Sequence, residues 1–189
     1  KAAVTLDSKN SSYWSNLASI YRQLVGSVDG SVDWSYQAYV QALNLDPVNP
    51  TLRLDFGGLL FAVGKYEEAD RLFEQVVSLK PDLANGWYNW AYTAKRLNKL
   101  SEAVTRLNQA VNLVPLTSGD YDKASKELEV WKKEYEELVK KQADLTKAET
   151  AKQAETLKLP EALPSGTSTT NVVVPTGGLE PPTGQPIPT

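Results

Sequence analysis

The sequence of 189 residues predicts an all-α fold, in which a solenoid of three helix hairpins is followed by one long helix and an extended tail. Two observations predict the solenoid. Pro47, Pro81 and Pro115 are spaced 34 residues apart, and apolar or small residues recur at helical spacing between them. A third observation predicts the tail, because 7 of the 11 prolines fall in the last 30 residues. The expected segments are a lead-in at 1–10, three hairpins at 11–117, a long helix at 118–158 and a tail at 159–189.

The first hairpin has the most unusual length. Its first helix is indicated by a spacing of 3, 1 and 3 residues, which places one face at Trp14, Leu17, Ala18 and Tyr21. The unit spans 39 residues where the period elsewhere is 34, and the excess falls at 25–33, where Gly-Ser-Val-Asp occurs twice. We therefore expect a longer connection between the two helices of this hairpin.

The second and third hairpins follow the period closely. Short turns are expected at Gly64-Lys65 and at Asn98-Lys99, each between two helices. Pro81 and Pro115 then prevent the second helix of each hairpin from continuing. Each unit is thus predicted to be a helix, a short turn and a second helix.

In register, these units resemble the tetratricopeptide repeat family. The second unit, 50–83, carries the small, large and turn residues of the family's motif at Gly57, Leu60, Gly64, Tyr66, Ala69, Phe73 and Pro81. The third unit matches it at Trp87, Trp90, Ala91, Asn98, Ala103, Ala110 and Pro115. The resemblance covers about 11–117 and implies a right-handed superhelix, with small residues where two helices cross closely. It also implies an inner groove formed by the first helix of each hairpin.

The groove residues follow from that resemblance. They are a mixture of polar, aromatic and basic side chains, namely Ser15, Asn16, Ser19, Arg22, Leu54, Asp55, Gly58, Phe61, Tyr88, Asn89, Tyr92, Lys95 and Arg96. Such a surface suits an extended, Pro-rich, weakly acidic peptide. In the alternative interpretation, Tyr88 and Tyr92 are ordinary packing residues. Some members of the family grip a peptide carboxylate with Lys and Asn, but Ser15, Leu54 and Tyr88 occupy the Lys positions here, so we do not expect that use.

The long helix is predicted because 120–157 contains no Gly or Pro and is rich in good helix formers. Its apolar residues keep a 3,4 spacing at Tyr121, Ala124, Leu128, Trp131, Tyr135 and Leu138, and Leu145 rejoins that register. We expect the part up to Trp131 to cap the third hairpin. Tyr135, Leu138 and Leu145 are then candidates for contact with a neighbouring subunit or another domain. The alternative for 140–158 is a solvated charged helix, and Glu134, Glu136 and Glu137 are interpreted as a solvated face.

The tail, 159–189, has no Lys, Arg or aromatic residue and is rich in Pro, Gly, Ser and Thr, so it cannot form a core of its own. The β-branched run ending in Val172, Val173 and Val174 favours an extended strand that could pair with a partner. The end of the tail, 180–189, favours polyproline II.

The composition argues against several classes of function. With no His and no Cys, the chain lacks an imidazole base, a thiolate and the usual zinc ligands, so we expect no enzyme activity, no cofactor and no metal. A net charge of −3 argues against nucleic-acid binding, and no apolar run is long enough for a membrane span.

Two hypotheses of function remain. The first is a structural protein that assembles head to tail with other copies of itself into a filament or fibre, because repeat stacks present unlike end faces. The alternative is an adaptor domain of a larger bacterial protein that binds a separate peptide in its groove. Because the sequence begins at Lys1 and not at Met, we expect a processed chain or a fragment, located outside the cell or at its surface, with the cytoplasm as the alternative.

Overall fold

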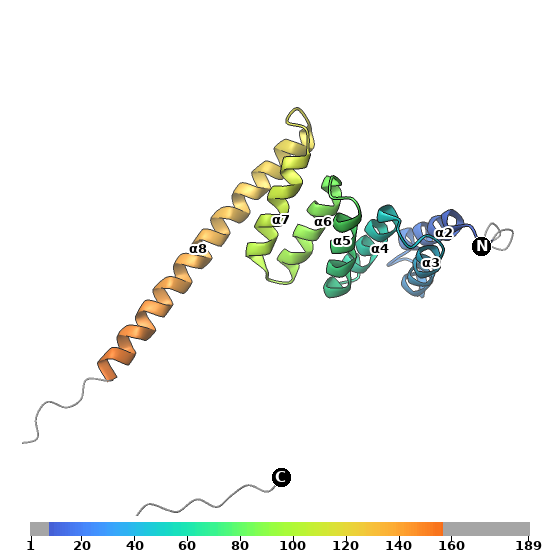
Figure 1. Cartoon of the computed structure of the whole chain (residues 1–189). Coiled ribbons are helices and arrows are strands. Elements are labelled where there is room, and N and C mark those ends of the chain that lie inside the picture. Colours follow the sequence, from blue (N-terminus) through green and yellow to red (C-terminus); the bar gives the residue numbers. More distant parts are fainter. Residues whose placement is uncertain (1–7, 157–189) are drawn as a thin grey trace, which may run out of the picture. The chain divides into compact units, whose positions relative to one another are not determined.

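The computed structural model describes residues 8–156, and Figure 1 shows its helices in order along the chain. The part that it describes contains helices and no strand, and forms the all-α repeat solenoid that the sequence predicts. The helices are α2 (Ser11–Gln23), α3 (Ser31–Leu45), α4 (Pro50–Ala62), α5 (Tyr66–Leu79), α6 (Ala84–Arg96), α7 (Leu100–Leu113) and α8 (Gly119–Thr156).

The chain divides into two compact units, 1–147 and 148–189. The first unit contains the helix hairpins together with α8 as far as residue 147. In the second unit, the described residues are 148–156, which form the last turns of α8, and the side chains of 148–155 are exposed.

The hairpins form by local signals in the sequence. Asn10 and Asn49 cap α2 and α4, since each side-chain oxygen accepts a hydrogen bond from a backbone N–H of the first turn. The turns after α4 and α6 each require a left-handed residue, which is Gly64 in the first case (φ 81°) and Asn98 in the second (φ 59°). The longer connection of the first hairpin runs from 24 to 30 and ends at Gly30, which precedes α3 with a φ of 75°.

The helices pack as three successive hairpins, in which α2 packs on α3, α4 on α5 and α6 on α7. Neighbouring hairpins meet through α3 with α4 and through α5 with α6. Two buried clusters result. One is centred on Phe56, Leu59 and Phe73, and the other on Ala91, Ala94 and Leu107.

One helix crossing in the second hairpin is especially close. A Cβ atom added at Gly57 of α4 would lie 2.6 Å from Cε1 of Phe73 in α5, well inside van der Waals contact, and Phe73 is fully buried. The equivalent pair in the third hairpin, one 34-residue period later, is Ala91 and Leu107. Compared with Leu107 and Ala91, the second hairpin thus has a larger side chain at Phe73 and a smaller residue at Gly57.

The start of α8 caps the third hairpin. Ala124, Leu128 and Trp131 are 5%, 4% and 3% exposed and belong to the same buried cluster as residues of α6 and α7. Beyond Tyr135, every described side chain of α8, from 136 to 155, is exposed. The packed surface of α8 therefore ends about one turn after Trp131.

Candidate functional site

The residues that the sequence assigns to the groove lie on α2, α4 and α6, the first helices of the three hairpins. These helices are neighbours, because α2 contacts α4 and α4 contacts α6. We call the set of assigned side chains on them the groove face. The side chains at the two ends of the groove face have different contacts.

At the α2 end, Arg22 reaches across to α4. Its Nη1 lies 3.9 Å from Oδ1 of Asp55 and 3.5 Å from the Asp55 carbonyl oxygen, and the guanidinium also lies close to Gly58. Burial raises the pKa of the Asp55 carboxyl, and the nearby Arg22 partly offsets this. Asn16 and Ser19, on the same helix as Arg22, are exposed.

The buried Tyr39 of α3 belongs to the same region. It is 1% exposed, and its hydroxyl has no hydrogen-bond partner among residues 8–156. Burial is the largest cause of the raised pKa of Tyr39, and the charge of Asp55 adds to it. The hydroxyl therefore stays protonated, and Tyr39 acts as a large core residue that stacks on Phe56 at 5.4 Å between ring centroids.

At the α6 end, a carboxylate of α8 engages the two groove tyrosines. The hydroxyl of Tyr88 donates to Oε2 of Glu127 at 3.0 Å, and the hydroxyl of Tyr92 donates to Oε1 of the same group. Burial first, and then the contact with Glu127, raises the pKa of Tyr92; burial also raises the pKa of Tyr88. The interpretation of both tyrosines as packing residues therefore fits the structure better than their assignment to a free groove.

Lys95 is also engaged by α8. Its Nζ lies 2.7 Å from Oε2 of Glu134 and 4.5 Å from the centroid of the Trp131 ring. Glu134 is exposed, as expected for a solvated face, and it also pairs with Lys95 because α8 passes close to α6 at this point. Glu136 and Glu137 are exposed, as expected.

The remaining groove residues differ in how accessible they are. Leu54 and Phe61 pack, half-buried, against the core cluster around Phe56, and Asn89 donates to Asn85 within α6. Arg96 is exposed, and its guanidinium carbon lies 5.9 Å from the centroid of the Tyr66 ring. Arg96 borders a recess of about 420 Å³ whose other lining residues are Tyr92, Lys95, Asn98, Glu127 and Trp131.

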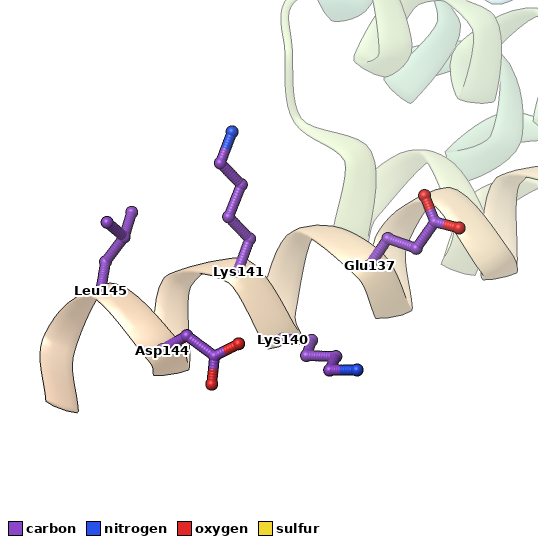
Figure 2. A pocket seen from close by; sticks show the side chains of 5 residues that line it. All are labelled: Glu137, Lys140, Lys141, Asp144 and Leu145. Carbon is purple, nitrogen blue, oxygen red and sulfur yellow. The ribbon is translucent and has the colours of Figure 1, made fainter. Parts of the chain in front are cut away.

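The second set of predicted contact residues lies on α8. Tyr135 is half-buried, whereas Leu138, Val139 and Leu145 are 41%, 44% and 55% exposed. A shallow recess of about 370 Å³ along this stretch is lined by Glu137, Lys140, Lys141, Asp144 and Leu145. Figure 2 shows that these five side chains all project from α8 itself. No second element forms a wall of the recess, so this is a helix surface and not an enclosed pocket. Val172, Val173 and Val174 lie outside the described residues.

A polar cluster joining three helices has no counterpart in the sequence predictions. The indole of Trp90 in α6 donates to Oδ1 of Asp70 in α5 at 2.9 Å, and Nη1 of Arg106 in α7 lies 2.8 Å from the same oxygen. The Arg106 guanidinium also stacks over the Trp90 ring at 3.7 Å. Residue spacing places Trp90 on an apolar helix face but does not indicate its two polar partners. The cluster connects the second hairpin to the third.

Residues 8–156 offer neither a metal-binding cluster nor a helix suited to span a membrane. That part of the chain has no group of three or more acidic side chains placed to hold a metal ion. Nor is any helix in it both long and apolar enough to cross a membrane.

Comparison with known proteins identifies the repeat. The family model described as tetratricopeptide repeat matches residues 52–83, which comprise most of the α4–α5 hairpin and the turn after it. Residues 52–83 of the chain therefore match a tetratricopeptide repeat. No curated protein sequence matches it.

Several solved structures share the fold, and two of those described below are tetratricopeptide repeat domains. The first such domain of Spaghetti (RPAP3), bound to the HSP90 peptide SRMEEVD, is 20% identical with a TM-score of 0.58, and the match covers 68% of this chain and 95% of that one. The Sgt2 domain from Aspergillus fumigatus is 18% identical with a TM-score of 0.58, covering 68% and 82%. The Yersinia enterocolitica type III secretion translocator chaperone SycD is 19% identical with a TM-score of 0.56, covering 64% and 84%.

Proposed function

We propose that this chain is a non-enzymatic scaffold that binds an extended, weakly acidic peptide segment of a partner protein along α2, α4 and α6. The observation that carries the proposal is the position of Arg96. This cation is exposed on a first helix, beside a recess of about 420 Å³ and an aromatic ring, and so is available to a partner.

The chemistry of the partner follows from the charges around Arg96. Lys95 is already paired with Glu134 and Arg22 with Asp55, so Arg96 is the groove-face cation without an acidic side chain paired to it among residues 8–156. A partner carboxylate near Arg96 would form a charge-assisted hydrogen bond at the edge of the recess. The Spaghetti structure supports the choice of partner class, since its peptide also contains acidic residues. We do not propose the same grip on a C-terminal carboxylate, because Ser15, Leu54 and Tyr88 occupy the Lys positions.

The test uses a labelled synthetic peptide with the sequence of residues 175–189, which is Pro-rich and contains Glu180. Fluorescence anisotropy would measure its affinity for the full chain. We expect Arg96→Ala to weaken binding about tenfold, because one charge-assisted hydrogen bond contributes roughly 1.5 kcal/mol.

The matched control is Arg71→Ala, which removes an exposed arginine from the second helix α5 and should leave the affinity unchanged. Failure of the peptide to bind, or equal weakening by the two variants, would count against the proposal.

A second candidate function is self-assembly head to tail into a filament, with α8 and the tail, including Val172–Val174, contacting neighbouring copies. The observation that favours it is the exposed run of Leu138, Val139 and Leu145, which continues the apolar register of Leu128 and Trp131 beyond the capped surface. Apolar residues on an otherwise charged, exposed helix are suited to contact with another helix.

Sedimentation velocity over a range of concentrations, with electron microscopy of the same samples, checks this candidate. We expect concentration-dependent association that Leu145→Glu reduces at least tenfold, since the substitution places a charge in the apolar contact. Ala143→Glu adds the same charge to an exposed position of α8 outside the register and should change nothing. A monomer at all concentrations would contradict self-assembly but not peptide binding.

A further inference from the structure

The outer face of the first hairpin is apolar and exposed. Each of its α2 positions has an equivalent 39 residues later in α4, so that Tyr13 corresponds to Leu52 and Ile20 to Leu59. Leu52 and Leu59 are 5% and 0% exposed, whereas Tyr13 and Ile20 are 38% and 55% exposed. The difference arises because α4 has a hairpin packed before it and α2 has none in the described residues.

The other end of the solenoid is not exposed in this way. Ala103, Leu107, Ala110 and Val111 of α7 are at most 6% exposed, because α8 covers the cluster to which they belong. The repeat array therefore has a cap after its last hairpin. A repeat array needs its terminal apolar faces covered to remain soluble, so we expect another element to cover the α2 face as well.

The segment before α2 has the local structure of a junction between hairpins. The Trp14 indole donates to the carbonyl of Ser8 at 2.8 Å, six residues earlier. At the junction between α5 and α6, the Trp87 indole donates to the carbonyl of Pro81 at 2.8 Å, also six residues earlier. Asn10 caps α2 in the same way as Asn49 caps α4 after α3.

The amino-acid sequence at this point agrees with the junction. Ala3-Val4-Thr5-Leu6-Asp7 corresponds, 39 residues later, to Ala42-Leu43-Asn44-Leu45-Asp46, which spans the end of α3. Ala42 and Leu45 recur as Ala3 and Leu6, with Val4 for Leu43 and the same Asp at the end. The sequence before α2 thus matches the sequence at the end of α3.

From these observations we propose that a further hairpin of the same repeat covers the outer face of α2, and that this hairpin immediately precedes α2 in the full-length polypeptide and ends in the sequence of residues 3–7. The occupant follows from continuity with the established hairpin interface. The hydrogen bond between Trp14 and Ser8 repeats the one between Trp87 and Pro81, and at that second junction α5 packs against α6, the first helix of the next hairpin.

The experiment adds to the full chain one more hairpin, copied from the chain's own second hairpin. Residues 50–73 of the second hairpin are fused directly before Lys1. Lys1 then stands where Glu74 stands in the second hairpin, which keeps the 39-residue and 34-residue spacing between equivalent positions. We expect one cooperative thermal transition with a midpoint raised by about 5 °C, because an added repeat contributes a nearest-neighbour interface. The same extension on an Ile20→Glu chain should give no increase. Ile20→Glu in the unextended chain provides the baseline, and its circular dichroism should be unchanged because Ile20 is exposed.

Two outcomes would overturn the inference. One is an extension that leaves the midpoint unchanged or melts as a separate transition. The other is a dimer of the unextended chain that Ile20→Glu dissociates and Leu145→Glu does not, since a second copy would then cover the face. Neither outcome bears on the binding of the peptide at Arg96, so failure of this inference is distinguishable from failure of the proposed function.

Discussion

Replacing Gly57 with alanine is expected to lower the free energy of unfolding by about 1–3 kcal/mol, although alanine is the better helix former. The new Cβ would lie 2.6 Å from Cε1 of Phe73, and because that ring is fully buried in a close-packed interior, moving it aside disturbs its neighbours. Urea unfolding monitored by circular dichroism measures the change.

The companion variant decides whether the close approach is the cause. Phe73→Leu alone should cost about 1 kcal/mol or more, because it removes buried ring atoms. Combined with Gly57→Ala, it recreates the pair that Ala91 and Leu107 form in the third hairpin. The double variant should therefore be more stable than the sum of the two single effects by about 1 kcal/mol or more. Strictly additive losses of stability would show that the residues at positions 57 and 73 do not constrain each other's size.

Trp131→Ala is expected to cost about 3–5 kcal/mol, the largest loss of any single change considered for this chain. Trp131 is 3% exposed, lies 5.1 Å from the Tyr92 ring between centroids and has Lys95 above its own ring. Its removal leaves a cavity where α8 covers α6 and α7. Since a whole domain has a stability of roughly 5–15 kcal/mol, this loss should markedly lower the unfolding midpoint in urea.

A second substitution on α8 provides the control for Trp131→Ala. Leu145 is 55% exposed, so Leu145→Ala should change the free energy of unfolding by less than about 0.5 kcal/mol in the monomer. If the two variants were equally stable, α8 would contribute nothing to the third hairpin.

The sequence indicated the fold because each hairpin is specified locally. Gly64 and Asn98 occur where the turns need a left-handed residue, and the period of Pro47, Pro81 and Pro115 separates the units. The part of α8 up to Trp131 was also correctly expected to cap the third hairpin, because its apolar residues keep one register. In each case, the spacing of residues close in sequence indicates the outcome, although the contact of Trp131 with Tyr92 itself joins distant residues.

The candidate site was less predictable, because it depends on contacts between distant residues. Tyr88 and Glu127 are 39 residues apart in the chain, and whether they meet depends on how α8 lies over α6. The pairing of Lys95 with Glu134 has the same cause, and a run of charged residues gives no sign of it. The repeat register is enough to assign Arg96 to the groove, but its exposure depends on how the surrounding helices pack.

The way in which α8 begins has a consequence for how such a protein lengthens during evolution. Tyr121 lies 34 residues after Trp87, so the start of α8 stands in the position of the first helix of a fourth repeat. A gene duplication that inserts another copy of α6 and α7 before α8 would present Ala124, Leu128 and Trp131 with the surface that they already cover. The number of repeats can therefore grow upstream of α8 while the capping helix is inherited unchanged.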